Sequence, residues 1–291
     1  MRRHFASLMI ALMVTSQAGA ATNWTSVDKV MGRAGAVQAG DVHRYSFPRS
    51  DLAVTLDRIA IKPALALGSW LAFHDMGERA EVMGDLVLTQ EEVNPVLSRL
   101  LAGGLTISAL HNHLLRSSPA TMYMHVHGEG DAVKLATALR QALSASHTPT
   151  GAPPVPTAPA VMSLDTKALD GALGAQGKVA GGTYQFSFPR AEQITENGMP
   201  VPASLGLATA INFQPTTSGR AVATGDFVMV GPEVGPVLTE LRNHGIEVTA
   251  LHNHLVGEQP RLFFMHFWGN DQASRLAQGL RAALDRMNLK R

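Results

Sequence analysis

The feature that most constrains the fold of this chain is an internal repeat with a constant spacing. Residues 84–115 (GDLVLTQEEVNPVLSRLLAGGLTISALHNHLL) match residues 225–256 (GDFVMVGPEVGPVLTELRNHGIEVTALHNHLV) without a gap, at an offset of 141 residues. The same offset relates YSFPR (45–49) to FSFPR (186–190), and MYMHVHG (122–128) to FFMHFWG (263–269). A chain of 291 residues can hold two units of this size, each with its own core, so we expect two similar domains.

The boundaries of the two domains follow from a linker between the copies. Residues 144–163 (SASHTPTGAPPVPTAPAVMS) contain repeated prolines, which break helices, and small residues that have little to bury. This composition predicts an extended, solvated linker. The first repeat domain then covers residues 21–143 and the second covers residues 164–291.

The first 20 residues have the composition of a secretory signal peptide. Arg2 and Arg3 precede an apolar run from Phe5 to Val14, and small residues from Ala18 to Ala20 form a cleavage pattern. The apolar run is too short to span a bilayer comfortably. We therefore expect a signal peptide over residues 1–20, a periplasmic or secreted location, and no stable membrane anchor after cleavage.

Apolar periodicity within a copy predicts an α+β fold. Strand patterns in the first copy cover residues 36–47, 52–61, 65–74, 80–88, 105–115 and 121–127. Helical spacing covers residues 24–33 and 90–102, and a further helix begins near Asp131. This order favours, in each copy, an antiparallel sheet with helices packed on one face, and the two copies are expected to be related by a pseudo-twofold axis.

Composition excludes several classes of protein. Hydrophobic residues make up 45% and charged residues 16% of the chain, which is typical of a globular protein rather than a disordered one. The chain has no cysteine, which excludes disulfides and thiolate metal ligands. The formal charge is only +1, with no basic run, so we expect no nucleic-acid partner.

Histidines are concentrated on the last two predicted strands of the first copy. His111 and His113 lie two residues apart on one strand, as do His125 and His127 on the next. Residues two apart on a strand share a face, and paired residues of an antiparallel hairpin have an even sum, so all four imidazoles should lie on one face. The residues between them, such as Met124, should face the core.

The second copy keeps three of these positions as His252, His254 and His266, with Trp268 in place of the fourth histidine. Three neutral imidazoles can bind a divalent metal such as zinc and leave a coordination position open for water or substrate. The sequence thus predicts a metal site in each copy, with metal-dependent hydrolysis as one use. The alternative is a non-enzymatic module whose histidine-lined groove binds a small molecule or a cell-envelope component.

Two further candidates occur only in the second copy. Glu258 shares the parity of the histidines and would be a fourth ligand or a general base, although an exposed turn glutamate is the plainer interpretation. The forked donors of Arg261 suit an anionic ligand group, and Trp268 would line the same binding site. Since Ser117 and Ala120 stand at the matching positions of the first copy, the two sites are expected to differ.

Other matched residues have structural interpretations. Glu92 and Glu233 lie near a helix N-terminus, where the backbone dipole favours negative charge. Asp85 and Asp226 each follow a glycine and are expected to shape a turn or the entry to a strand. The duplicated Phe-Pro-Arg motif is expected to mark a strand end.

The motif HNHLVGEQPRLFFMHFWG (252–269), followed by a helix rich in leucine and alanine, resembles the bacterial LpqO/LppY-like family of mycobacterial lipoproteins. The resemblance covers nearly all of both copies. It implies an exported or envelope location and brings no activity with it. The chain lacks the cysteine that carries the lipid in those lipoproteins.

Overall fold

The computed structural model describes residues 22–151 and 162–290. The predicted signal peptide (1–20) and the middle of the predicted linker lie outside these ranges. Within them, none of the helices combines the length and the apolar character needed to cross a membrane.

Each half of the chain forms one antiparallel sheet of six strands, as predicted. The strand order of the first sheet is β1 (Ala36–Gln38), β2 (Val42–Pro48), β5 (Gly68–Asp75), β6 (Ala80–Thr89), β8 (Thr121–Gly130) and β7 (Thr106–His111). The second sheet repeats it as β9 (Lys178–Ala180), β10 (Thr183–Pro189), β13 (Ala208–Pro215), β14 (Arg220–Val230), β16 (Leu262–Gln272) and β15 (Glu247–His252). The two halves therefore have the same topology.

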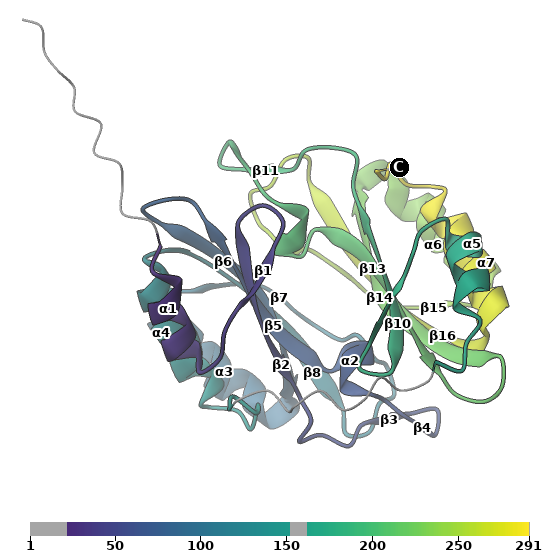
Figure 1. Ribbon diagram of the computed structural model, residues 1–291, viewed down its shortest axis with the longest axis horizontal. Coiled ribbons are helices and arrows are strands. Elements are labelled where there is room, and N and C mark those ends of the chain that lie inside the picture. Colours follow the sequence, from purple (N-terminus) through teal and green to yellow (C-terminus); the bar gives the residue numbers. More distant parts are fainter. Residues whose placement is uncertain (1–21, 152–161, 291) are drawn as a thin grey trace, which may run out of the picture.

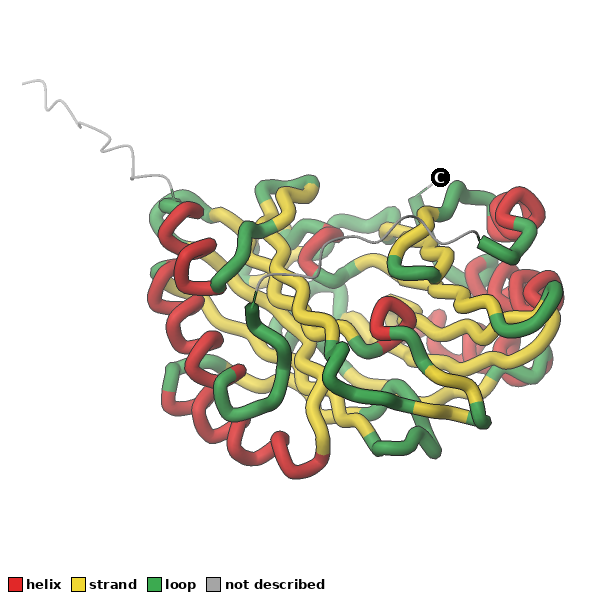
Figure 2. Tube along the Cα trace, turned by 60° about the horizontal axis from the view of Figure 1, so that its bottom comes forward, coloured by secondary structure: helices red, strands yellow, loops and turns green. Residues whose placement is uncertain are grey.

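Three helices cover the outer face of each sheet, so the molecule has four layers in the order helix, sheet, sheet, helix (Figures 1 and 2). The first sheet carries α1 (Trp24–Met31), α3 (Gln90–Ala102) and α4 (Ala132–Leu143). The second carries α5 (Thr166–Leu173), α6 (Gly231–Asn243) and α7 (Ala273–Leu284). Met124 and Val126 face the helices, as strand alternation predicts.

The inner faces of the two sheets pack against each other and form a further apolar core. Met83 and Val42 of the first half are buried together with Leu207 and Phe264 of the second. Each half also sends a short hairpin toward the other half. These hairpins are β3–β4 (Thr55–Leu56 and Ile59–Ala60) and β11–β12 (Thr195–Glu196 and Met199–Pro200). Equivalent contacts made in both directions agree with the predicted pseudo-twofold.

A buried arginine anchors the first turn of a helix in each half. Arg49 of the Phe-Pro-Arg motif has no exposed surface, and its Nη1 lies 2.8 Å from Oε2 of Glu92 in α3. Arg190 makes the same contact with Glu233 in α6, at 2.6 Å. The motif thus does more than mark a strand end, because its arginine joins the sheet to the helix that the glutamate begins.

Four predicted strands have different limits in the structure. The strand predicted over 36–47 is broken by a turn in which Gly40 and Asp41 have positive φ angles of 76° and 53°. Only short pairs form within 52–61, and the strand predicted over 65–74 is preceded by α2 (Pro63–Ala66), which begins at a proline that needs no backbone N–H there. The strand predicted over 105–115 ends at His111, where Asn112 Oδ1 accepts a hydrogen bond from the backbone N–H of Leu114.

The first part of the predicted linker packs on the first domain rather than lying in solvent. The backbone N–H of His147 donates to Glu92 Oε1 at 2.7 Å, and Thr148 is buried. Arg140 Nη1 donates to the carbonyl oxygen of Thr150 at 3.0 Å. These hydrogen bonds extend the first domain to residue 151.

Candidate metal centre

Six of the seven predicted histidine ligands meet in a single cluster between the two sheets. His111 and His252 end the edge strands β7 and β15, and these strands lie next to each other. The cluster consists of His111, His113, His125, His252, His254 and His266. The predicted second-copy set of His252, His254 and His266 does converge, but the packing of the sheets merges it with the first-copy histidines, so the two sets are not spatially separate.

Contacts between rings follow the pseudo-twofold axis. His111 stacks on its own counterpart His252, with ring centroids 3.8 Å apart. The centroids of His113 and His266 are 3.6 Å apart, and those of the equivalent pair, His254 and His125, are 3.8 Å apart. Most close contacts in the cluster thus join histidines of different halves.

Two backbone carbonyls orient the histidines of the central strands. His125 Nδ1 lies 3.2 Å from the carbonyl oxygen of Gly84, and His266 Nδ1 lies 2.9 Å from that of Gly225. Since a carbonyl oxygen only accepts, each Nδ1 carries the proton and each Nε2 keeps a free lone pair. Both glycines are required by space, because a Cβ on Gly225 would overlap the carbonyl oxygen of Ala210.

One aspartate from each half completes the cluster. Asp85 is the register partner of His125 on the adjacent strand, and Asp226 is that of His266. The distance from Asp85 Oδ2 to His113 Nε2 is 3.4 Å, and Asp226 Oδ2 lies equally far from His254 Nε2. These aspartates lie in the middle of long strands rather than at a strand entry, so their predicted structural role is wrong.

Aromatic rings and a cross-half hydrogen bond hold the outer histidines. Tyr123 stacks on His113 with ring centroids 3.5 Å apart, and Phe264 stacks on His254 at 3.4 Å. Ser108 Oγ donates a hydrogen bond to the carbonyl oxygen of His254. His113 and His254 follow the ends of their strands, and these contacts keep their rings in the cluster.

Burial makes the cluster neutral. Desolvation lowers the pKa of His252 to about 4, and it lowers the pKa values of His113 and His254 well below the ordinary value, with neighbouring histidines adding to the effect. Burial also raises the pKa of Asp85 to about 7 and that of Asp226 well above its usual range. Neutral imidazole is the form that binds a metal ion.

Many polar atoms of the cluster have no hydrogen-bond partner, which is uncommon for buried groups. Among the residues that the structure describes, they are Asp85 Oδ1, His111 Nδ1, Asp226 Oδ1, His252 Nδ1, both ring nitrogens of His254, and His266 Nε2. Where two imidazole rings meet, one N–H can donate to a nitrogen of the neighbouring ring. This hydrogen bond leaves the other ring nitrogens of the cluster without a partner. A bound ligand or ion would satisfy them.

The distances between ring nitrogens suit a common metal ion. The Nε2 atoms of His111 and His113 are 3.0 Å apart, and those of His125 and His252 are 3.1 Å apart. Zinc–nitrogen bonds of about 2 Å place neighbouring ligand nitrogens roughly 3 Å from each other. Three groups of three histidines offer nitrogens that all lie within 4.8 Å of one another, and each group except that of His252, His254 and His266 draws on both halves.

The cluster forms part of the wall of a cavity of about 1130 Å³. Asp85, His113 and His125 of the first half line it together with Asp226, His254 and His266 of the second. A cavity of this size can hold a small molecule. A molecule inside it would touch the cluster directly.

His127 lies outside the cluster, although it is on the predicted face of β8. Its Nε2 is 3.1 Å from Glu81 Oε1 and 3.8 Å from Glu196 Oε2. Burial alone lowers the pKa of His127, but the hydrogen bond to Glu81 and the charges of both glutamates outweigh this and raise it. Two residues along a strand correspond to about 7 Å, so the side chain reaches the carboxylates instead of the other histidines.

The three second-copy candidates lie in other surroundings. Glu258 is fully buried in the β15–β16 loop, where it accepts a hydrogen bond from the backbone N–H of Leu262 and faces Arg261 Nη1 at 3.4 Å. Arg261 also donates to the carbonyl oxygen of Val256 in the same loop. Trp268 is a core residue whose Nε1 donates to Asp57 Oδ2 at 3.1 Å. The structure brings none of the three into the cavity wall next to the histidines.

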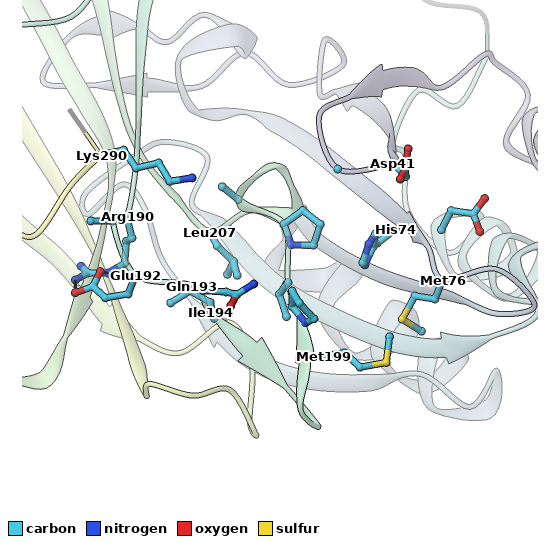
Figure 3. Close-up of a pocket in the computed structure, with 17 residues that line it drawn as sticks. Asp41, His74, Met76, Arg190, Glu192, Gln193, Ile194, Met199, Leu207 and Lys290 are labelled. Carbon is cyan, nitrogen blue, oxygen red and sulfur yellow. Dashed lines mark hydrogen bonds and ion pairs between the residues drawn. The ribbon is translucent and has the colours of Figure 1, made fainter.

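A second cavity, of about 580 Å³, lies against the β11–β12 hairpin (Figure 3). Asp41, His74 and Met76 of the first half line it, as do Arg190 and Glu192 of the second. None of the six clustered histidines lines this cavity. Its side chains therefore form no part of the metal centre.

Sequence reasoning underestimated Asp85 and Asp226. The available signal was the Gly-Asp pair repeated inside an apolar strand of both copies, since a carboxylate in the middle of a buried strand needs a partner. The parity argument that placed the histidines on one face also applies to these residues, once β6 and β14 are paired with the histidine strands.

Comparison with known proteins identifies both halves of the chain. A protein-family model described as Domain of Unknown Function (DUF1259) matches residues 25–145 and again residues 167–286. A comparison with curated proteins gave no match.

Two solved structures show a weak likeness to the whole chain. One is the trimeric bacterial microcompartment shell protein PduB, which is 14% identical with a TM-score of 0.24, over 88% of this chain and 91% of that chain. The other is EtuB from Clostridium kluyveri, which is 9% identical with a TM-score of 0.21, over 87% of this chain and 89% of that chain. At these TM-scores the likeness carries no argument about this protein.

Proposed function

Since the chain belongs to the family described as Domain of Unknown Function (DUF1259) and contains its domain twice, we propose that the two repeats together form one shared centre for a divalent metal. The observation that carries this proposal is the pair of Nε2–Nε2 distances, 3.0 Å for His111 and His113 and 3.1 Å for His125 and His252. Zinc fits best, because neutral imidazoles are its preferred nitrogen ligands.

The centre would hold at least one ion. Any two of the three histidine groups share one member, namely His111, His252 or His266, so the groups are alternative ligand sets. Three imidazoles on one ion would leave a coordination position open. A bound cation would favour the ionised form of Asp85 and Asp226, which would then balance its charge or take a ligand position. Glu258 is not part of this proposal, since its carboxylate already has partners in its own loop.

The location we propose is periplasmic or secreted. Residues 1–20 carry the charge, apolar run and cleavage pattern of a signal peptide. The resemblance to the LpqO/LppY-like lipoproteins points to the same compartment, without the lipid anchor. N-terminal sequencing of the exported protein is expected to begin at Ala21, and retention of residues 1–20 would contradict this location.

A metal-dependent hydrolase is one form of this function. A zinc ion with an open position lowers the pKa of bound water to about 7 and polarises carbonyl or phosphoryl oxygens. The cavity beside the centre supports such a role. Hydrolysis of p-nitrophenyl acetate and bis-p-nitrophenyl phosphate, with and without chelator, tests it.

The second form is a non-enzymatic module that binds a small molecule or a cell-envelope component. The size of the cavity and its mixed lining of histidine, aromatic and polar side chains support this form equally. Metal content that is restored after chelation, without turnover of either ester, would favour this form.

Metal analysis of untagged protein tests the proposal directly. Mass spectrometry is expected to find zinc, or else copper, manganese, nickel or iron, at one or more ions per chain. Chelation should lower the melting temperature and added metal should restore it, because an ion that binds only the folded state stabilises it.

A ligand-deficient variant and a matched control complete the test. The double variant His111→Ala, His266→Ala removes a ligand from each of the three histidine groups and is expected to lose the metal. His147→Ala removes an imidazole whose side chain is 89% exposed and should leave the metal content unchanged. No metal in the wild type, or full metal in the double variant, would refute the proposal.

A further inference from the structure

The cavity beside the histidines contains a cation that the repeat does not duplicate. Arg44 on β2 lines the cavity, and the residue at the matching position of the second half is Gln185, which lines it as well. Tyr45 and Phe47 face the helices, so alternation turns Arg44 to the inner face of the sheet. One half of the cavity wall thus differs in charge from the other.

Arg44 is held in place by an aromatic ring and has no ion-pair partner. Its guanidinium carbon lies over the ring of Trp70, 4.0 Å from the ring centroid, a cation–π contact that helps to hold the group in place. Within residues 22–151 and 162–290, no carboxylate oxygen lies within ion-pair distance of its nitrogens and no hydrogen bond satisfies them. Burial lowers the pKa of Arg44 to about 10, and nearby Asp85 opposes this effect, so the group is charged at neutral pH.

A partly buried cation of this kind is matched to an anion from outside the chain. Removing a charged group from water is costly unless a partner of opposite charge compensates it. The forked N–H donors of arginine fit the two oxygens of a carboxylate or phosphate. Lys178, which also lines the cavity and is exposed to solvent, adds a second positive charge to the cavity wall.

We propose that the cavity binds a small molecule through a carboxylate or phosphate group, which Arg44 holds while Trp70 fixes the guanidinium. This inference rests on the proposed function only in that the remainder of the ligand would then lie against the metal centre. The half that supplies Arg44 determines the orientation of the ligand, since Gln185 and Ala210 occupy the positions of the other half that match Arg44 and Trp70.

Calorimetric titration with inorganic phosphate and with succinate tests the proposal and separates the two kinds of anion. The protein is used as purified and again after chelation, so that binding to a metal ion is distinguished from binding to Arg44. Arg44→Gln introduces the residue of the second half, and it is expected to weaken binding of the preferred anion about tenfold or more. Arg44→Lys keeps the charge without the fork and should bind with intermediate affinity, which also shows that the cavity is intact.

Arg275→Gln is the control for net charge, because Arg275 lies on the surface of α7 with its side chain 73% exposed. It should bind like the wild type. Equal affinities of the wild type and Arg44→Gln, or no binding of either anion by the wild type, would overturn the proposal. Metal content should be the same in Arg44→Gln as in the wild type. A failure of the anion proposal would therefore not contradict the metal centre. If the protein contains no metal, the titration after chelation still tests binding to Arg44.

Discussion

The Nε2 atoms of His125 and His252 lie 3.1 Å apart, although 127 residues separate them in the chain and they belong to different sheets. This short contact between two ring nitrogens joins the repeats at the histidine cluster. Two of the three histidine groups that could hold an ion thus combine imidazoles of both halves.

Replacement of one histidine in the first half should therefore remove metal that the second half helps to bind. We expect His125→Ala to lose at least half of the bound metal, because His125 lies within ligand distance of both His252 and His111. Metal analysis of the purified variant measures the loss.

His127→Ala is the matched control, since His127 is on the same strand but contacts Glu81 and Glu196. It should keep the metal of the wild type. Loss of metal in His127→Ala with full retention in His125→Ala would show that the sites are assigned to the wrong histidines.

The aspartates should strengthen metal binding. Asp85→Asn keeps the shape of the side chain and removes an ionisable carboxyl group whose Oδ2 lies 3.4 Å from His113 Nε2. We expect the affinity for zinc to fall about 10- to 100-fold, the usual effect of removing a group that supports a metal ligand. Competition with a chromogenic chelator measures this affinity. Asp131→Asn, at the N-cap of α4 where asparagine caps equally well, should bind zinc like the wild type.

Gly225 should tolerate no side chain. A methyl group there would collide with the carbonyl oxygen of Ala210 and displace the carbonyl that orients His266. Gly225→Ala is expected to lower the free energy of unfolding by about 2 kcal/mol or more and to reduce the metal content. Gly235→Ala lies inside α6 with open space around it, so it should stabilise the fold by about 0.5–1 kcal/mol. Urea unfolding compares the two, and equal stabilities would contradict the close approach at Gly225.

The ion pair of Arg49 and Glu92 should make stability depend on pH. Burial alone raises the pKa of Glu92, but hydrogen bonds from Arg49 and from backbone N–H groups outweigh this and lower it. A carboxyl group with a lowered pKa stabilises the fold above its unfolded value of about 4.3, and this contribution is lost as the pH falls through the folded pKa.

Glu92→Gln is thus expected to cost about 3 kcal/mol of unfolding free energy at pH 7 and much less at pH 3. Denaturant unfolding at both pH values measures the difference. Glu91→Gln changes an exposed neighbour in the same helical turn and should cost less than about 1 kcal/mol at pH 7. A constant difference between Glu92→Gln and the wild type at the two pH values would exclude the ion pair as its source.

Local pattern was sufficient to predict the repeated sheet and the direction of its side chains. The alternation of β8 places His125 and His127 on one face and Met124 on the other, as observed, because the backbone of a strand imposes this geometry without help from distant residues. The linker was harder to predict, since the burial of Thr148 depends on the first domain and not on the composition of residues 144–163.

The sequence by itself determined that two similar units exist and that each presents histidines from two neighbouring strands. Only the tertiary structure decided that these histidines form one cluster, that His127 is excluded from it, and that Asp85 and Asp226 belong to it. The physical reason is range: periodicity fixes contacts within one sheet, whereas the meeting of His125 with His252 depends on how the inner faces of two sheets bury their apolar side chains against each other.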